Sequence, residues 1–264
     1  MQSMKLSAPQ AIRTIFFDAG FTLIRPSPSM LDVCQAVCRQ YGLHLDSDAL
    51  AQQLPAAEAY FFEAARRNQR TWANEEAITL FWAGYYRALL RPFIAEDNEP
   101  LLERCVLAII HEFDRHTSWE LFPDVLPTLQ ALQGRDFTIG IISDWGANLI
   151  PIISGLDVGR YFDCVIISAV TRYAKPEAAL YDLALRRANA IPDYAIHIGD
   201  SYIHDVLGAR SVGITPILLD RPGLLRAEDI DCILIRDLRE VLDLLDLPAN
   251  APARRAAEQQ DAWS

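Results

Sequence analysis

Short runs of consecutive apolar residues occur near the start of the chain and throughout its second half. These runs are TIFF at 14–17, FTIGIIS at 137–143, DCVIISA at 163–169, YAIHIG at 194–199, TPILL at 215–219 and CILI at 232–235. A strand that is buried on both faces has this continuous apolar character. Helical patterns lie between the runs, near 125–132, 176–190 and 203–212. The alternation predicts an α/β fold with a doubly wound parallel sheet.

The middle of the chain, residues 29–116, has helical periodicity and lacks comparable strand runs. Its first helical segment, MLDVCQAVCRQY, presents one apolar face and is followed by Gly42, a residue suited to a helix C-terminus. Asn74, with acidic residues directly behind it, predicts the N-cap of a later helix. These residues therefore form a helical insert that separates the first strand from the rest of the sheet.

The same patterns predict how the chain is divided into domains. The core consists of residues 1–25 and 118–247, and the helical insert, expected to be a separate cap domain, of residues 26–117. The final segment, 248–264, is rich in alanine and polar residues, so we expect a flexible tail.

The composition is that of a globular protein with an acidic surface. Of 264 residues, 51% are hydrophobic and 22% charged, and the formal net charge is −11. Such a surface disfavours nucleic acid and anionic membranes, whose phosphates require clustered cations. The sequence has no run of about 20 apolar residues, as a membrane span needs, and its polar N-terminus does not resemble a secretory signal. We therefore expect a cytoplasmic protein. The five cysteines lie in apolar contexts, which favours core packing over metal binding.

Polar side chains with chemical potential follow four of the predicted strands. They are Asp18 after the first, Ser143 and Asp144 after the second, Lys175 beyond the third, and Asp200 and Asp205 after the fourth. In an open parallel sheet, ligands bind beyond the carboxyl ends of the strands. We therefore expect these side chains to meet in one crevice.

A site with several carboxylates, a cation and a hydroxyl suits phosphoryl transfer. Crowded carboxylates repel one another, and Mg²⁺, which takes oxygen ligands and usually bridges carboxylates and a phosphate, relieves this repulsion. A carboxylate that is not fully occupied by the metal can attack phosphorus and form an aspartyl-phosphate. Ser143 and Lys175 would then stabilise the charge on the transferring oxygens, helped by backbone N–H groups of the loop 19–22.

Four segments, in this order, resemble the motifs of the haloacid dehalogenase-like hydrolases. The segments are IFFDAGFTL, IGIISD, AKPEAALYDLAL and HIGDSYIHDVLGARSVGI. The resemblance spans about residues 14–220, and the helical insert lies where one large subgroup of the family carries a four-helix cap. It implies a Rossmann-like core, Mg²⁺ as cofactor and, in most members, phosphatase activity on a small phosphorylated metabolite.

The resemblance also assigns roles to individual residues. It implies that Asp18 is the nucleophile, assisted by Lys175. Ser143 and Lys175 would bind the phosphate, and Thr22 would orient the first loop of the substrate-binding site. Asp144 is a further substrate-binding candidate from its position, and a place behind the metal ligands or an N-cap for the next helix is equally open. The metal ligands would be Asp18, the backbone carbonyl of Gly20, Asp200 and Asp205.

The first motif departs from the family pattern at two positions. Phosphatases of the family usually carry a second aspartate two residues after the nucleophile, where this chain has Gly20, and a glycine one place later, where it has Phe21. The missing aspartate protonates the leaving group and then activates water, a contribution of about 10²–10⁴ in rate. Glycine keeps the carbonyl that binds the metal, so the departure affects proton transfer most directly.

Two alternative functions remain open for this sequence. One is a protein of this fold that has lost catalysis and binds a ligand or a protein; the other is a metal-independent 2-haloacid dehalogenase. The phosphonate-cleaving variant is disfavoured because it uses a cap lysine, and the helical insert contains none. His204 is a candidate replacement proton shuttle, His197 a core residue, and Trp145 a residue at the border of the crevice. Neither the substrate nor the oligomeric state follows from the sequence.

Overall fold

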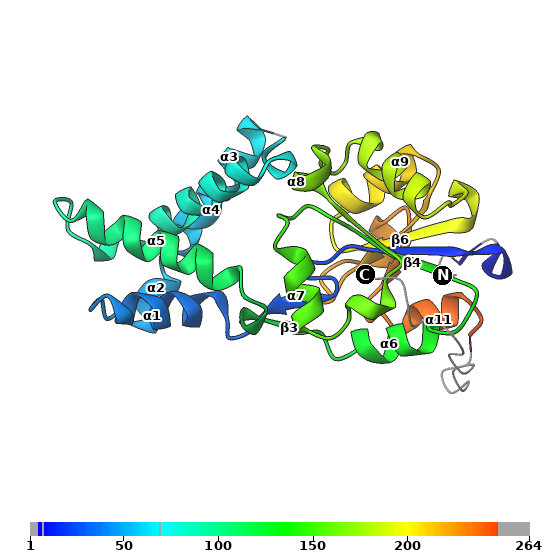
Figure 1. The fold of residues 1–264 in the computed structure, drawn as a ribbon, viewed down its shortest axis with the longest axis horizontal. Coiled ribbons are helices and arrows are strands. Elements are labelled where there is room, and N and C mark those ends of the chain that lie inside the picture. Colours follow the sequence, from blue (N-terminus) through cyan, green and yellow to red (C-terminus); the bar gives the residue numbers. More distant parts are fainter. Residues whose placement is uncertain (1–4, 7, 69, 248–264) are drawn as a thin grey trace, which may run out of the picture.

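A computed structural model describes residues 5–6, 8–68 and 70–247 of the chain (Figure 1). Six strands form one parallel sheet in the order β5-β4-β1-β6-β7-β8. Their bounds are Thr14–Phe17 for β1, Thr138–Ser143 for β4, Cys164–Ile167 for β5, Ala195–Gly199 for β6, Thr215–Leu219 for β7 and Ile233–Ile235 for β8. The predicted α/β fold class is therefore confirmed, with β1 between β4 and β6.

Helices cover both faces of this sheet, and side chains alternate between the two. Ile15 and Phe17 of β1 join one hydrophobic cluster, whereas Phe16 joins another on the opposite face. The first cluster contains side chains of α6 (Val125–Leu132), α7 (Leu149–Gly155) and α11 (Glu240–Leu244), and the second those of α9 (Ala178–Arg187) and α10 (Gly208–Ser211).

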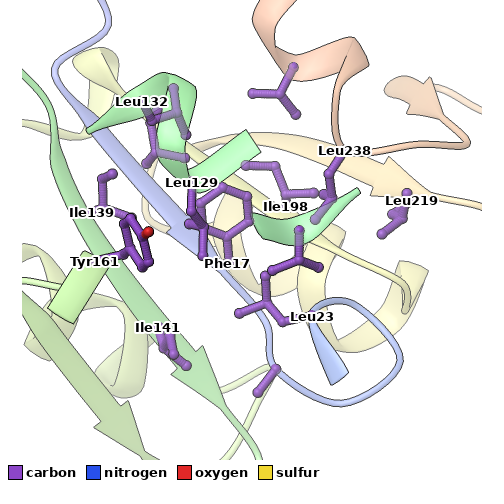
Figure 2. Close-up of a cluster of buried hydrophobic side chains, with 14 of the residues drawn as sticks. Phe17, Leu23, Leu129, Leu132, Ile139, Ile141, Tyr161, Ile198, Leu219 and Leu238 are labelled. Carbon is purple, nitrogen blue, oxygen red and sulfur yellow. The ribbon is translucent and has the colours of Figure 1, made fainter. Parts of the chain in front are cut away.

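The cluster around Phe17 shows why β1 is so firmly fixed (Figure 2). Its ring is surrounded by side chains from the neighbouring strands and from α6, among them Leu129, Ile141 and Ile198. Burial of one such side chain contributes about 1.5–3 kcal/mol. The residue after Phe17 therefore leaves the sheet from a strand that is packed on both faces.

Most predicted elements are found within one or two residues of their expected limits, with two differences. The run DCVIISA was predicted as strand throughout, but β5 ends at Ile167 and the helical turn α8 (Ser168–Thr171) follows. At this point the chain makes tertiary contacts, since the Ser168 hydroxyl donates to the Trp72 carbonyl (2.5 Å) and accepts the Trp145 N–H (3.1 Å). The helix expected at 203–212 begins as a π-helical turn, Tyr202–Leu207, before α10.

A two-stranded antiparallel sheet, which the sequence pattern did not predict, joins the core to the helical insert. It pairs β2 (Ile24–Pro26) with β3 (Trp119–Leu121), with Pro26 opposite Trp119. Three-residue strands are too short to show a periodicity. The chain enters and leaves the helical insert through this pair.

The helical insert has its own hydrophobic cluster and lies to one side of the sheet (Figure 1). Its helices are α1 (Met30–Gln40), α2 (Ser47–Ala51), α3 (Leu54–Arg67), α4 (Glu75–Leu90) and α5 (Glu99–Phe113). Asn74 caps α4 as predicted, accepting the N–H groups of Glu76 and Ala77, and Gly42 after α1 has a φ of +77°. The domain limits at 25/26 and 117/118 stay a prediction, and the predicted tail lies outside the described residues.

Polar contacts tie the helical insert to the segment that follows β4. The Glu75 carboxylate, in the first turn of α4, accepts the N–H of Ala147 (2.5 Å), and Asp114 accepts from the Asn148 side chain (2.7 Å). The position of the insert is therefore coupled to the loop that begins at Asp144.

The expectations about membrane spans and about the cysteines can be compared with the described residues. Within residues 5–6, 8–68 and 70–247, no helix combines the length and the apolar character that crossing a membrane would require. Four of the five cysteines are buried and Cys164 is half-buried, all as free thiols, in agreement with the expected core packing.

Candidate active site

Asp18 is the first residue after β1, the strand near the middle of the sheet. Its backbone N–H donates to the carbonyl of Ile198 in β6 (2.8 Å), which extends the ladder by one residue beyond the strand. The side chain is buried among polar groups. Because β4 and β6 flank β1, the residues that follow these two strands lie on either side of Asp18.

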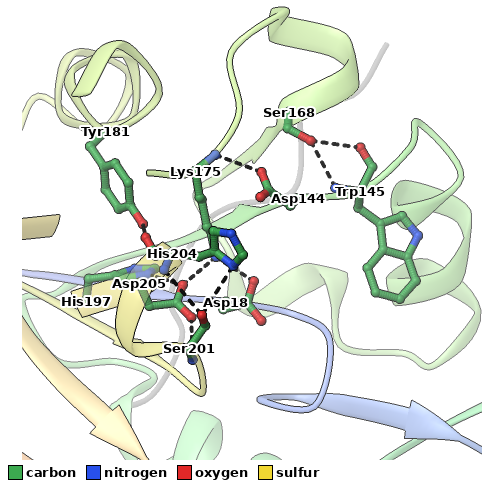
Figure 3. Close-up of polar contacts among 10 residues, drawn as sticks. All are labelled: Asp18, Asp144, Trp145, Ser168, Lys175, Tyr181, His197, Ser201, His204 and Asp205. Atoms are coloured by element: carbon green, nitrogen blue, oxygen red, sulfur yellow. Dashed lines mark hydrogen bonds and ion pairs between the residues drawn. The ribbon is translucent and has the colours of Figure 1, made fainter. Parts of the chain in front are cut away.

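Lys175 connects two of the predicted acids (Figure 3). Its Nζ donates to Asp18 Oδ1 and to Asp205 Oδ1, both at 2.6 Å. The residue is 3% exposed, so the ammonium group is paired with carboxylates and largely excluded from solvent. Its backbone N–H donates to Asp144 Oδ1 (2.9 Å), which fixes the start of the segment that leads to α9. The chain has 22 arginines and two lysines, so a lysine at this position is distinctive.

Asp205 is held from three directions. Besides Lys175, its Oδ1 contacts His197 Nε2 (2.9 Å), and its Oδ2 accepts the backbone N–H of Ser201 (3.0 Å). The close approach also explains Gly199, because a Cβ there would lie 2.1 Å from the Asp205 carboxyl carbon. His197 is fully buried, as expected of a core residue, but it also supports the site, a role that the sequence analysis missed.

The charges in this network shift the pKa of each member. Burial raises the pKa of Asp18, with Lys175 opposing and Asp205 reinforcing the shift. Burial alone would raise the pKa of Asp205, but Lys175 and His197 hold it below its ordinary value. Burial would lower the pKa of Lys175, yet the charges of Asp18 and Asp205 raise it well above the usual range. Lys175 is therefore a permanent cation at neutral pH.

Ser143, Asp144 and Asp200 follow the flanking strands as predicted. Ser143 is the last residue of β4 and is buried. Burial raises the pKa of Asp144 to about 7, against the charge of Lys175. At the end of β6, desolvation by surrounding atoms and the charges of Asp18 and Asp205 raise the pKa of Asp200 to about 7. The acids at this edge of the sheet therefore repel one another, as the sequence analysis expected.

Trp145 lies against Gly20, at the position of the missing second aspartate. A Cβ built on Gly20 would lie 3.0 Å from Trp145 Cζ3, and the next two nearest atoms, at 3.7 and 4.0 Å, belong to the same ring. The φ angle of Gly20 lies outside the left-handed region, so its backbone would accept another residue. The obstacle to a side chain at this position is therefore the indole of Trp145.

The next two residues of this loop are supported from outside it. Phe21 has a φ of +56°, a left-handed conformation that favours glycine, and its ring is 59% exposed. Arg221 donates to the carbonyls of Phe21 (3.2 Å) and Thr22 (2.6 Å), and its guanidinium also pairs with Asp124 (2.9 Å). Thr22 itself is fully buried, and its hydroxyl has no hydrogen-bond partner among the described residues.

Of the predicted site residues, the structure links Asp18, Asp144, Lys175 and Asp205 by hydrogen bonds. It places Ser143 and Asp200 at the ends of the adjacent strands, and Gly20 and Thr22 in the loop after Asp18. His204 contacts Ser201 through its Nδ1 (3.2 Å). The sequence analysis did not anticipate Arg221, because its contacts connect residues about 200 positions apart in the chain.

The donors at this edge fit a magnesium ion with mixed ligands. Among the described residues, no three acidic, histidine or cysteine side chains are gathered closely enough to hold a metal alone. Mg²⁺ does not require such a cage, because it is usually bound through one or two carboxylates, waters and the substrate phosphate. The repulsion that raises the pKa of Asp200 is the electrostatic situation that a cation relieves.

Comparison with known proteins gives consistent matches over most of the chain. A human haloacid dehalogenase-like hydrolase domain-containing protein 3 is 26% identical over 222 residues, which cover 81% of this chain and 84% of that protein. A phosphoglycolate phosphatase of Escherichia coli O157:H7 is 26% identical over 257 residues, with 92% and 96% coverage.

A solved structure supports the same fold. The HAD-hydrolase YfnB of Bacillus subtilis, bound to magnesium, aligns with a TM-score of 0.72 at 18% identity, over 89% of this chain and 99% of that one. Residues 12–213, three quarters of the chain, match the family of haloacid dehalogenase-like hydrolases. With the ordered motifs now placed around one strand end, the family that the sequence predicted is confirmed, and the chain belongs to the haloacid dehalogenase-like hydrolases.

Proposed function

We propose that this hydrolase is a Mg²⁺-dependent phosphatase that acts on a small phosphorylated metabolite through an aspartyl-phosphate at Asp18. The observation that carries the proposal is the bridge from Lys175 to both Asp18 and Asp205. It fixes one oxygen of Asp18, whereas Oδ2 receives no hydrogen bond from the described part of the chain. That oxygen is the nucleophile that we assign.

The protein groups around Asp18 suit attack on a phosphorus atom. A bond forms between Asp18 Oδ2 and phosphorus as the bond to the leaving oxygen breaks. An ammonium has three N–H donors, and two of those of Lys175 are engaged by carboxylates, so the third can bind a phosphoryl oxygen. The Ser143 hydroxyl, at the end of β4, supplies a second donor. Donors that are fixed before the reaction stabilise the developing charge without reorganisation.

Asp18, Asp200 and the Gly20 carbonyl would hold the magnesium ion, which supplies charge neutralisation on the phosphoryl oxygens when bound. The fourth predicted ligand, Asp205, already accepts from Lys175, His197 and Ser201. We therefore assign Asp205 to positioning Lys175 and not to direct metal binding. Thr22 and Asp144 keep their proposed places in the substrate site, Asp144 through the Lys175 backbone.

The relatives support the choice of reaction but not the identity of the substrate. One of them is a phosphoglycolate phosphatase, and that name describes a small phosphorylated substrate for that protein. An acidic chain with a net charge of −11 is a poor partner for nucleic acid or for anionic membranes. The expected cytoplasmic location stays a prediction.

The test is hydrolysis of p-nitrophenyl phosphate by the purified protein, measured with Mg²⁺, with a chelator and with the Asp18→Asn variant. We expect activity that requires Mg²⁺ and falls by at least about 10⁴-fold in the variant, because the covalent route is lost. Thermal melting of the variant is the control for folding.

Other outcomes would favour the alternatives. Activity on 2-haloacids that persists with the chelator would replace the proposal with a metal-independent dehalogenase. If the folded wild-type protein has no more activity than Asp18→Asn on p-nitrophenyl phosphate, on acetyl phosphate or on 2-haloacids, the alternative of a binding protein is favoured. Retained hydrolysis in a folded Asp18→Asn variant would contradict the assigned nucleophile.

A further inference from the structure

We infer that the substrate of this site is a phosphate ester or anhydride whose leaving group departs as a stabilised anion, such as an aryl, enol or acyl phosphate. The inference rests on the proposed function and extends it to the class of substrate. Its basis is the absence of an acidic side chain at Gly20, where phosphatases of the resembled family carry their proton donor, together with the Trp145 indole that packs against this position.

Trp145 crowds position 20, where even a Cβ would require the indole to shift by a few tenths of an ångström. The atoms nearest to a Cβ on Gly20 are three carbons of the indole, at 3.0, 3.7 and 4.0 Å. These atoms carry no transferable proton. The residue two places after Asp18 therefore has indole carbons as its nearest neighbours and contributes its backbone alone.

The indole is held in this position by both parts of the molecule. Its ring packs edge-on against Trp119 of β3, with 4.9 Å between the ring centroids, and Trp119 Nε1 donates to the Phe113 carbonyl (2.9 Å). The Trp145 backbone N–H donates to Ser168 Oγ, which in turn donates to the Trp72 carbonyl of the helical insert. Trp119 therefore packs against the ring itself, and Ser168 holds the backbone from which the ring projects.

Most other titratable groups near Asp18 have contacts of their own, and Asp200 is assigned to the proposed metal site. The Lys175 ammonium is bound to two carboxylates, and Asp205 accepts from three donors. Asp144 accepts the backbone N–H of Lys175, and His204 faces Ser201. These contacts serve to position Lys175 and the turn after β6, so the geometry assigns none of these groups to the leaving oxygen.

Without a proton donor, the leaving oxygen must carry a negative charge when its bond to phosphorus breaks. As the bond from Asp18 to phosphorus forms, the leaving oxygen takes the pair of the broken bond and receives no proton. An alkoxide formed in this way is a poor leaving group, and general-acid assistance is typically worth about 10²–10⁴ in rate. A phenolate, enolate or carboxylate is stable enough to leave without that assistance.

The test measures kcat/KM for a series of substituted phenyl phosphates whose phenols differ in acidity. Without a general acid we expect a steep dependence, with a loss of at least about 100-fold from p-nitrophenyl phosphate to phenyl phosphate. Acetyl phosphate and ethyl phosphate extend the comparison to an anhydride and to an alkyl ester. If acetyl phosphate is cleaved and the aryl esters are not, the substrate is an anhydride; if the reverse holds, it is an ester.

Two double variants provide a matched comparison. In Gly20→Asp/Trp145→Ala there is room for a carboxyl group at position 20, and we expect the dependence on leaving-group acidity to become shallow. Gly20→Asn/Trp145→Ala has the same shape without the acid and should keep the steep dependence. The wild-type series alone tests the inference if neither variant folds.

A wild-type kcat/KM that depends only weakly on the acidity of the leaving group would overturn the inference. If that dependence then became steep in Asp144→Asn or in His204→Asn, the substituted residue would be identified as the general acid. Equal rates for ethyl and acetyl phosphate would also contradict the inference. A failure of the proposed function looks different, because no member of the series would then be hydrolysed faster by the wild-type protein than by Asp18→Asn.

Discussion

The two sides of Asp18 differ in chemistry (Figure 3). On the side of β6, Lys175, His197 and Ser201 form a polar network in which all three contact the Asp205 carboxylate. On the side of β4, past Ser143 and Asp144, the indole of Trp145 covers Gly20 with carbon atoms. We call these the polar side and the indole side.

The difference separates two tasks that a phosphatase site usually combines. The polar side can stabilise charge, since it fixes Asp18, the proposed nucleophile, and presents a permanent cation. The indole side lacks the acid that would transfer protons to and from oxygen. A site can therefore keep the means to form an aspartyl-phosphate while it loses the means to assist the departure of a poor leaving group.

Removal of the cation of the polar side should have the largest effect. We expect Lys175→Met to lower hydrolysis by about 10²–10³-fold and to cost about 3–5 kcal/mol of stability, because it leaves two buried carboxylates without a counter-ion. The same substitution at the exposed Lys5 is the matched control and should change neither quantity. Steady-state kinetics and urea denaturation measure the two effects. An active, stable Lys175→Met would show that the polar network is not essential.

The contacts by which Arg221 supports the loop after Asp18 should give the next largest effect. Arg221→Ala removes the partner of Asp124, which is 2% exposed, together with two donors to the loop carbonyls. We expect a loss of about 3 kcal/mol in the free energy of unfolding. Arg210→Ala, which breaks an exposed ion pair with Asp231, should cost at most about 1 kcal/mol. Equal losses in the two variants would argue against a specific role for Arg221.

A smaller effect concerns the backbone of the same loop. A left-handed conformation costs a residue such as Phe21 about 1–2 kcal/mol. Glycine lacks the Cβ that causes this cost, although its more flexible unfolded chain offsets about 0.5–1 kcal/mol of the gain. Phe21→Gly should therefore be more stable than Phe21→Ala, which loses the same exposed ring and keeps the strain. Chemical denaturation of the two variants provides the comparison. A more stable alanine variant would contradict the assigned strain.

A further predicted effect depends on pH and involves Asp144. Its folded pKa of about 7 lies above the value of about 3.9 in an unfolded chain. Between these values the folded state binds more protons, so stability falls as the pH rises. Asp144→Asn removes this penalty. The melting temperature of the variant minus that of the wild-type protein should therefore increase from pH 5 to pH 8. A difference that is constant, or that shrinks with pH, would contradict the raised pKa.

The two sides also differ in how far the sequence revealed them. The polar side was predictable because apolar runs identify the strands, and parallel strands bring the residues after them, such as Asp18 and Asp200, to one edge. The departure at Gly20 was visible, but not its cause, because Trp145 lies 125 positions later and packing between distant side chains leaves no local signal. The strained φ of Phe21 and the contact of His197 with Asp205 likewise depend on tertiary structure.

The central claim, that the polar side is functional and the indole side lacks an acid–base group, is tested most directly in the first turnover. Without a base to activate water, hydrolysis of the aspartyl-phosphate should be slower than its formation from p-nitrophenyl phosphate. Rapid mixing should then release about one equivalent of p-nitrophenolate per protein in a burst, with phosphate trapped on Asp18 and no burst in Asp18→Asn. Product release that is linear from the first turnover, without a phosphorylated protein, would contradict the account.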